Sequence, residues 1–147
     1  MKIIGNGKKV LNNTYAGNFV DAILLAMEKE EALGEIFNIR DERLVTREEF
    51  IGAVCRYLGK PDPRHVPQWL ARSVVGMIEG MAKLRGAKTA PLLTRARIKF
   101  MTLNLDFSIA KAQEKLGYKA RVDFQEGIQE TLDWVTGSAA EAAKRAA

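Results

Sequence analysis

Apolar residues recur at helical spacing along most of the chain, and capping residues mark where the helices begin and end. Asn18 and Asp21 have the spacing of an N-cap and a third helical residue, and the apolar positions that follow predict a helix of about three turns. Thr46 and Glu49 form a capping box before a second helix, which Gly59 is expected to close.

The rest of the chain shows the same helical pattern. Pro67 is suited to the first turn of a helix whose apolar positions run over residues 70–84, and a loop is predicted at residues 86–91. Thr94 is expected to cap the next helix, and Gly117 to end a later one. Further helices are predicted at residues 96–101, 109–116 and 124–135.

Strand signals are few. Short strands are predicted at residues 10–15 and 34–39, and residues 104–108 look extended. An isolated pair of strands is marginally stable, and parallel strands joined by helices normally lie in a larger sheet that is buried on both faces. The pattern therefore predicts that these strands need a partner, either upstream sequence or another subunit.

Composition is typical of one globular domain. The 147 residues are 47% hydrophobic and 28% charged, and we expect a domain over residues 1–136 and an alanine-rich tail over residues 137–147 that frays. No apolar run approaches the roughly 20 residues of a membrane span, and no signal peptide opens the chain, which predicts a cytoplasmic protein.

The net charge is +5, which permits weak attraction to nucleic acid, anionic lipid or a phosphorylated ligand. The basic residues are spread along the chain without aromatic interleaving or a recognisable reading motif, so specific nucleic-acid binding is not expected. Cys55 lies in an apolar helical stretch, as a buried inert thiol does, and His65 has no companion at metal-ligand spacing. No metal site is predicted.

Three stretches, in order, resemble the C-terminal part of the extended short-chain dehydrogenase/reductase family, nearest to its NAD-dependent epimerase/dehydratase and 3-beta-hydroxysteroid dehydrogenase-like branches. They are residues 5–22, residues 34–50, and residues 107–134, with the lysine–alanine, leucine–glycine–tyrosine and glutamate–glycine groups of the closing segment. The resemblance implies an α/β, mostly helical, partial Rossmann-like C-terminal portion with two or three short strands and five or six helices. It also implies a substrate-side role for residues 1–136.

The parts that carry catalysis in that family have no counterpart here. Residues 5–7 hold two glycines but no third, and they do not lead directly into a helix, so no dinucleotide fingerprint is present. The family's catalytic tyrosine stands four residues before a lysine, and Tyr15, Tyr57 and Tyr118 all lack that lysine. The sequence thus predicts no catalytic residue and no cofactor bound by this chain, although the family uses NAD or NADP. It predicts a truncated protein that is inactive alone and contributes substrate binding.

Two departures from the family pattern affect the expected substrate. Leu11 stands where the nucleotide-sugar epimerases carry an arginine for the pyrophosphate, and Ser108 and Ala110 replace an aspartate and a serine. Both changes favour a small apolar or steroid-like substrate over a nucleotide sugar.

Five residues are candidates for the substrate pocket, and each has a plainer explanation. Asn18 can be an ordinary N-cap, and Tyr15 and Trp69 can be packing aromatics. Arg95 and Arg97 can bind an anion through their guanidinium groups, but at i and i+2 on a helix they do not share a face.

The same observations leave other interpretations open. A standalone small-ligand or protein-interaction module that self-associates through open strand edges fits the few strands. The expected partners are accordingly a second copy or a complementary N-terminal Rossmann half. A basic helical nucleic-acid binder rests on charge alone.

Overall fold

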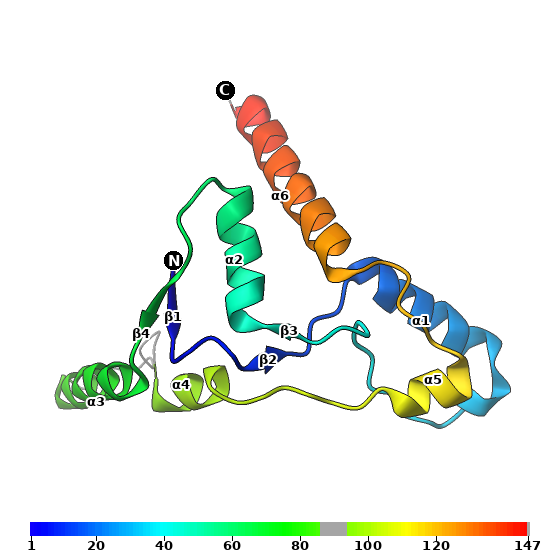
Figure 1. Ribbon diagram of the computed structural model, residues 1–147, viewed down its shortest axis with the longest axis horizontal. Helices are drawn as coiled ribbons and strands as arrows, with labels where there is room; N and C mark the ends of the chain where they lie inside the picture. The colour runs from blue at the N-terminus through cyan, green and yellow to red at the C-terminus, as the bar shows by residue number, and fades with distance from the viewer. Residues whose placement is uncertain (86–93, 147) are drawn as a thin grey trace.

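The computed structural model describes residues 1–85 and 94–146 (Figure 1). The described residues form six α-helices, a short 3-10 helix and four short strands, which confirms the mostly helical α/β class. The helices are α1 (Ala16–Glu28), α2 (Arg47–Tyr57), α3 (Gln68–Leu84), α4 (Arg95–Met101), α5 (Ala110–Leu116) and α6 (Phe124–Ala146), with the 3-10 helix at Glu30–Ala32. The strands are β1 (Lys2–Ile4), β2 (Val10–Leu11), β3 (Val45–Thr46) and β4 (Arg64–Val66).

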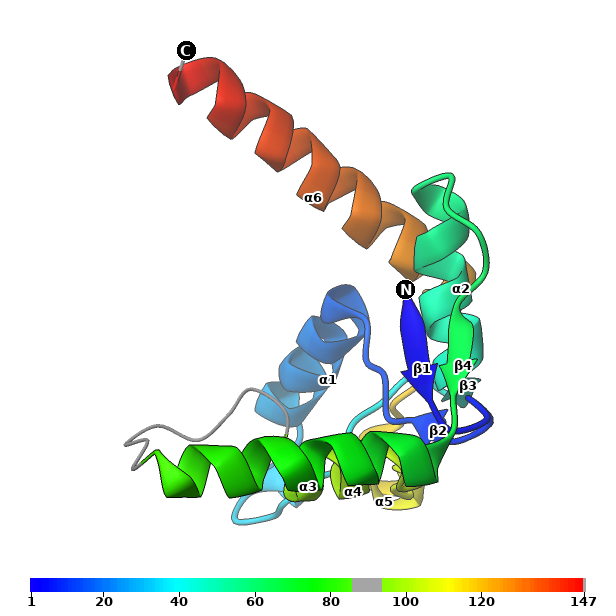
Figure 2. The same cartoon turned by 90° about the vertical axis from the view of Figure 1, so that its left-hand side faces the viewer.

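The helices pack in pairs rather than around one centre. Helix α1 contacts α5, α2 contacts α6, and α3 contacts α4, and each pair has its own small apolar cluster. The α1–α5 and α3–α4 pairs lie at opposite ends of the molecule, and α6 projects away from the rest (Figures 1 and 2). The buried members of the three clusters are Ala22, Ile109, Ala112, Leu116 and Tyr118; Val45, Ala53 and Phe124; and Ala71, Val75 and Ile98.

The strands form two separate pairs. β1 lies parallel to β4, with Ile3 opposite His65, and β2 lies antiparallel to β3, with Leu11 opposite Val45. Each sheet has only two strands among the described residues. On the other edge of β2, the Val10 carbonyl accepts a hydrogen bond from the Leu105 backbone N–H at 3.2 Å, although residues 104–105 are not a strand. The expectation of a few short strands without a complete sheet is confirmed.

Two strand predictions are wrong in extent. The predicted strand at residues 34–39 is irregular, and Ile36 is 85% exposed. None of the strands in the described part of the chain pairs with this segment. The predicted strand at residues 10–15 is confined to β2, because the Asn13 carbonyl accepts a hydrogen bond from the Asp41 backbone N–H instead of a strand partner.

Local capping signals are confirmed where they depend on neighbours in the sequence. Thr46 Oγ1 accepts a hydrogen bond from the Glu49 backbone N–H at 3.1 Å, and Thr94 Oγ1 accepts one from the Arg97 N–H at 3.2 Å. Gly117 ends α5 in the left-handed conformation. Asn18 is not an N-cap, since α1 already begins at Ala16.

The last helix is longer than predicted. Its backbone is helical through Ala146, well beyond the predicted end at residue 135, because alanine, glutamate and lysine are strong helix formers. The division between a domain over residues 1–136 and a fraying tail stays a prediction. The predicted loop at residues 86–91 lies outside the described residues. Within the described part of the chain, no helix has the length and apolar character needed to cross a bilayer.

An exposed ion-pair cluster holds the irregular segment after α1 against α5. Glu35 accepts hydrogen bonds from Lys111 at 2.6 Å and from Lys115 at 2.5 Å. These two lysines, Lys111 first, lower the pKa of Glu35 from its ordinary 4.5 to about 2. The carboxylate is therefore more acidic in the folded chain than in the unfolded one.

This shift predicts a defined pH dependence of stability. Because the folded pKa is depressed, the contribution of Glu35 is present above its ordinary pKa of 4.5 and is lost as pH falls toward about 2. We expect Glu35→Gln to flatten the loss of stability over that pH range, measured by urea unfolding at a series of pH values. The control Glu31→Gln, at an exposed glutamate nearby, should keep the wild-type profile. Equal profiles for both variants would contradict the prediction.

Candidate functional site

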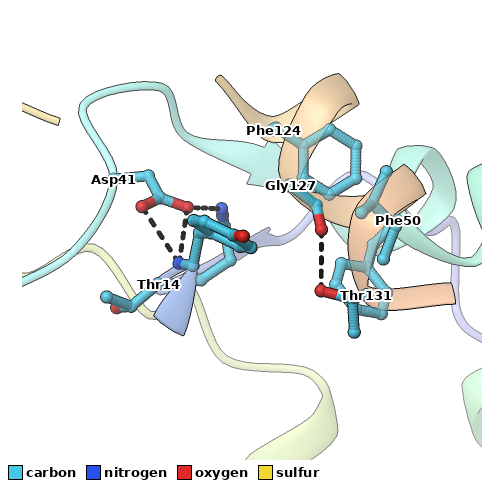
Figure 3. A pocket seen from close by; sticks show the side chains of 9 residues that line it. Thr14, Asp41, Phe50, Phe124, Gly127 and Thr131 are labelled. Carbon is cyan, nitrogen blue, oxygen red and sulfur yellow. Dashed lines mark hydrogen bonds between the residues drawn. The ribbon is translucent and has the colours of Figure 1, made fainter. Parts of the chain in front are cut away.

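A buried carboxylate lies where the chain enters α1. Asp41 is only 3% exposed, and its oxygens accept hydrogen bonds from Asn13 Nδ2 at 2.8 Å and from the Tyr15 backbone N–H at 3.1 Å (Figure 3). Asp41 Oδ1 also accepts a hydrogen bond from Asn18 Nδ2 at 2.8 Å. A carboxylate is also favoured at this place by the dipole of the helix that begins at Ala16. Asp41 therefore joins the segment before α1 to the segment before β3.

Asn18 extends this network to a third segment. Its side chain is fully buried, and its Oδ1 accepts hydrogen bonds from the backbone N–H groups of Arg121 and Val122, both at 3.0 Å. Its Nδ2 donates to Asp41 Oδ1 and to the Val122 carbonyl, both at 2.8 Å. The amide uses both donor hydrogens and both acceptor positions, so Asn18 cross-links three segments and does not act as a helix cap.

A small cavity opens beside this network, between the start of α1, α2 and α6 (Figure 3). Its volume is about 160 Å³, close to that of an engineered apolar cavity that binds benzene. Pockets for whole drug-sized ligands are about 300–1,000 Å³, so this cavity has room for one ring or a branched alkyl group of a ligand. Its walls are Phe50, Phe124, Gly127 and Ile128 on the apolar side, and Asn13, Thr14, Tyr15, Asp41 and Thr131.

The apolar wall is well defined. The Phe50 and Phe124 rings pack with centroids 5.8 Å apart, and the Arg43 guanidinium lies 5.3 Å from the centre of the Phe124 ring. The Thr131 hydroxyl is already engaged, because it donates a 2.7 Å hydrogen bond to the Gly127 carbonyl. The cavity thus offers a mainly apolar surface, whose one carboxylate is already bound by three protein groups.

Tyr15 separates this cavity from a neighbouring hollow that Glu130 and Trp134 also line. Its hydroxyl donates a hydrogen bond to the Glu130 carboxylate. That hydrogen bond, followed by desolvation and the negative charge of Glu130, raises the pKa of Tyr15. The phenol therefore holds its proton more tightly than a free tyrosine, which suits packing and ligand contact rather than proton abstraction.

Gly127 gives the Tyr15 ring its place against α6. A Cβ atom on Gly127 would lie 2.8 Å from Tyr15 Cδ2, closer than carbon atoms tolerate. The glutamate–glycine pair at residues 126–127 belongs to the closing segment of the family resemblance, and the structure supplies a physical reason for the glycine.

The other predicted pocket residues lie at the opposite end of the molecule. Trp69, at the start of α3, is 69% exposed, and Arg95 and Arg97 lie on α4 (Figure 1). Arg95 Nε is 3.5 Å from a carboxylate oxygen of Glu79, so its charge already has a partner. The structure therefore brings Tyr15 and Asn18 together but does not bring the other three to the same cavity.

Cys55 and His65 are the remaining residues considered for thiol chemistry and metal binding. Cys55 is buried, and His65 contacts Glu48 at 3.2 Å and the Gly5 carbonyl at 3.0 Å. Among residues 1–85 and 94–146, no group of three or more histidine, cysteine, aspartate or glutamate side chains is placed to hold a metal ion.

Asp41 is not among the site residues that the sequence predicts. The side chains that bind Asp41 are 23 and 28 residues away in the sequence, so no local pattern distinguishes it from its charged neighbours. Asn18 was found, but with the wrong role, because its spacing to Asp21 imitates a cap.

Known proteins resemble this chain along most of its length. It is 30% identical over 142 residues to the 3beta-hydroxysteroid-dehydrogenase/decarboxylase isoform 1 of Arabidopsis thaliana, a match that covers 89% of this chain and 32% of the relative. It is 31% identical to the sterol-4-alpha-carboxylate 3-dehydrogenase of Schizosaccharomyces pombe, covering 90% of this chain and 40% of the relative. No family model matches the chain.

A solved structure shows the same fold. An epimerase from Methanothermobacter thermautotrophicus superposes with a TM-score of 0.65 at 22% identity, over 97% of this chain and 34% of that one. The predicted resemblance to 3-beta-hydroxysteroid dehydrogenases and epimerases is confirmed by these matches. The chain spans about a third to two fifths of the length of the curated relatives it matches.

The Asn18 network predicts a large loss of stability on truncation. Asn18→Ala removes four hydrogen bonds and leaves part of the buried Asp41 carboxylate unpaired, so we expect a loss of about 3 kcal/mol in the free energy of unfolding. Urea unfolding followed by circular dichroism measures it. Asn38→Ala, at an exposed asparagine, is the matched control and should change stability by less than about 0.5 kcal/mol. Similar losses for both variants would contradict the role of Asn18.

The two glycines of α6 predict opposite effects of one substitution. Gly127→Ala forces the Tyr15 ring away from the helix and should destabilise the chain by about 1–3 kcal/mol. Gly137→Ala places its methyl group in open space and should stabilise the helix by about 0.5–1 kcal/mol. Thermal unfolding of both variants checks the prediction, and a gain for Gly127→Ala would show that the Tyr15 ring does not need the space.

Proposed function

We propose that this chain forms the C-terminal, substrate-side part of an NAD(P)-dependent dehydrogenase or epimerase. In this proposal a complementary Rossmann-type part, carried by the same polypeptide or by another, binds the dinucleotide. The observation that supports the proposal is the sequence match, which covers about nine tenths of this chain but only 32–40% of the length of the two dehydrogenase relatives.

The exposed apolar face of α1 supports the proposal that a complementary part covers this chain. One face of α1 packs on α5, while five large apolar side chains of α1 are exposed to solvent, with Met27 at 78%. The parallel pair β1–β4 also has unpaired edges, although parallel strands are normally covered on both faces. A contiguous exposed apolar face is typical of a surface that another element covers. The exposed residues of α1 are Phe19, Val20, Ile23, Leu24 and Met27.

The residues present do not fit a dinucleotide. Gly5 and Gly7 both have positive φ values, but the loop that they form leads into β2 rather than into a helix. A pyrophosphate site of the Rossmann type needs a helix N-terminus directly after the glycine turn. This chain contributes no hydride-transfer step under the proposal, and its residues bind and orient the substrate.

The expected substrate is a small apolar molecule. The cavity beside Tyr15 has an aromatic and aliphatic wall, and Leu11 in β2 replaces the arginine expected for a nucleotide sugar. The printed names of the Arabidopsis and fission yeast relatives describe steroid or sterol dehydrogenases. The cavity would take one ring or branched group, and the complementary part would cover the rest of the molecule.

A second candidate function is a self-associating binding module. The same exposed α1 face and open strand edges favour pairing of two copies. Sedimentation over a range of concentrations separates the two functions, since a module of this kind associates without any partner. The predicted cytoplasmic location remains a prediction under either function.

The proposal predicts no dinucleotide binding by this chain alone. Calorimetric titration with NAD and NADP should show no binding up to about 1 mM, because the pyrophosphate site is missing.

Mixing the chain with the dinucleotide-binding part of the fission yeast relative should give a complex. Phe19→Glu with Ile23→Glu, on the exposed face of α1, should prevent that complex while leaving the fold intact. Tight NAD binding by the chain alone would overturn the proposal.

A further inference from the structure

A second hollow, of about 410 Å³, lies between the loop at residues 5–7, the start of α2 and the end of α4. Arg47 and Lys9 line it together with the neutral polar side chains of Asn6, Gln68 and Thr102. No aspartate or glutamate is among its lining residues. The hollow is therefore positively charged and rich in hydrogen-bond donors.

Arg47 is a partly buried cation without an anionic partner. Its Nε atom is inaccessible to solvent and has no hydrogen-bond partner, and its Nη2 reaches only the Phe100 carbonyl, at 3.4 Å. No carboxylate of the described residues lies within ion-pair distance of it. Desolvation lowers the pKa of Arg47. A desolvated guanidinium that lacks a counter-charge is unfavourable unless another group pairs with it.

Two other arginines of the chain form ion pairs with carboxylates. Arg43 binds Glu49 at 2.6 Å, and Arg121 binds Asp21 at 2.6 Å. The carboxylate nearest to Arg47 in sequence, Glu48, contacts His65 at 3.2 Å instead. Arg43 and Arg121 are thus paired with carboxylates, whereas Arg47, which lines a hollow, has no carboxylate of the described residues beside it.

The backbone around the hollow is already used, so the site is made by side chains. The N–H groups at the start of α2 donate to the loop, Arg47 N to the Lys9 carbonyl at 3.0 Å and Glu48 N to the Gly7 carbonyl at 3.1 Å. A side chain on Gly7 would meet Glu48 Cβ at 2.8 Å, so the glycine allows the loop to lie close to α2. The helix N-terminus is therefore capped by protein, and the guanidinium is the group left to bind a ligand.

We propose that Arg47, assisted by Lys9, binds the oxyanion of a small ligand in this hollow, either a carboxylate or a phosphate. A guanidinium binds both groups through two parallel hydrogen bonds, and Lys9 adds a flexible second charge at the rim. The site is distinct from the cavity beside Tyr15, because the two share no lining residue. As the anchor for an acidic group carried by an otherwise apolar substrate it rests on the proposed function, whereas the binding of the anion itself does not.

The test uses the full chain and two probes, inorganic phosphate and cyclohexanecarboxylate, at constant ionic strength set with chloride. We expect binding of one anion per chain, seen as a shift of the Arg47 Nε–H resonance in a ¹⁵N spectrum. Arg47→Gln should weaken binding about tenfold or more, since a hydrogen bond to a charged group is lost. Lys9→Gln should weaken it about threefold, and Lys8→Gln, an exposed lysine outside the hollow, less than about twofold. The probe that binds more tightly identifies the anion source.

A second measurement separates ligand binding from a structural role. Without anion, Arg47→Gln should raise the melting temperature, because it removes an unpaired buried charge. Added anion should then raise the melting temperature of the wild type but not of Arg47→Gln, as mass action requires. A purely structural Arg47 predicts the opposite, a lower melting temperature for the variant with no dependence on the anion.

Three results would overturn the proposal. The first is an Arg47 Nε–H resonance that responds to neither probe. The second is a loss of binding in Lys8→Gln equal to that in Arg47→Gln. The third is a lower melting temperature for Arg47→Gln that does not depend on the anion. If Arg47→Gln does not fold, Lys9→Gln and the wild-type spectrum still decide the question. Failure here leaves the predicted absence of NAD binding and the assembly with a dinucleotide-binding part untouched, so the two proposals fail separately.

Discussion

The buried carboxylate of Asp41 is the constraint on which this part of the molecule depends. A charge removed from water must be fully paired, and here two asparagine side chains and one backbone N–H supply the donors. The Asn18 side chain also binds the backbone N–H groups of Arg121 and Val122, and so connects Asp41 to the segment before α6. Three stretches that are remote in sequence are thereby held at fixed positions around the start of α1.

The cavity follows from that arrangement. Asp41 holds the backbone of Tyr15, and the side chain of Tyr15 lies against α6 at the one place where a glycine admits it. Among the described residues that line the cavity, the two ionisable side chains are already engaged: Asp41 accepts hydrogen bonds from three protein groups, and the Tyr15 hydroxyl, whose pKa is raised, donates to Glu130.

The buried charge of Asp41 and the partly buried charge of Arg47 differ in how they are paired. Asp41 is completely satisfied by protein groups, whereas Arg47 has an unpaired Nε and one long hydrogen bond. The first charge organises the fold, and the second faces a hollow that can admit a counter-ion. The apolar residues of the described part of the chain form three small clusters, and one face of α1 remains exposed.

The sequence by itself determined the features that depend on near neighbours. The caps at Thr46 and Thr94, the left-handed Gly117 and the helical periodicity of α3 involve residues within a few positions of one another, and the resemblance to sterol dehydrogenases rests on similar short motifs. Only the tertiary structure decided whether residues 34–39 pair as a strand, what Asn18 binds, and that Arg47 lines a hollow with no carboxylate among its lining residues. Those outcomes depend on groups 23 to 104 residues away, whose approach no local pattern encodes. Residues 34–39 pair with none of the strands that the structure describes, and the Asn18 amide has partners only because α1 lies against the segment before α6.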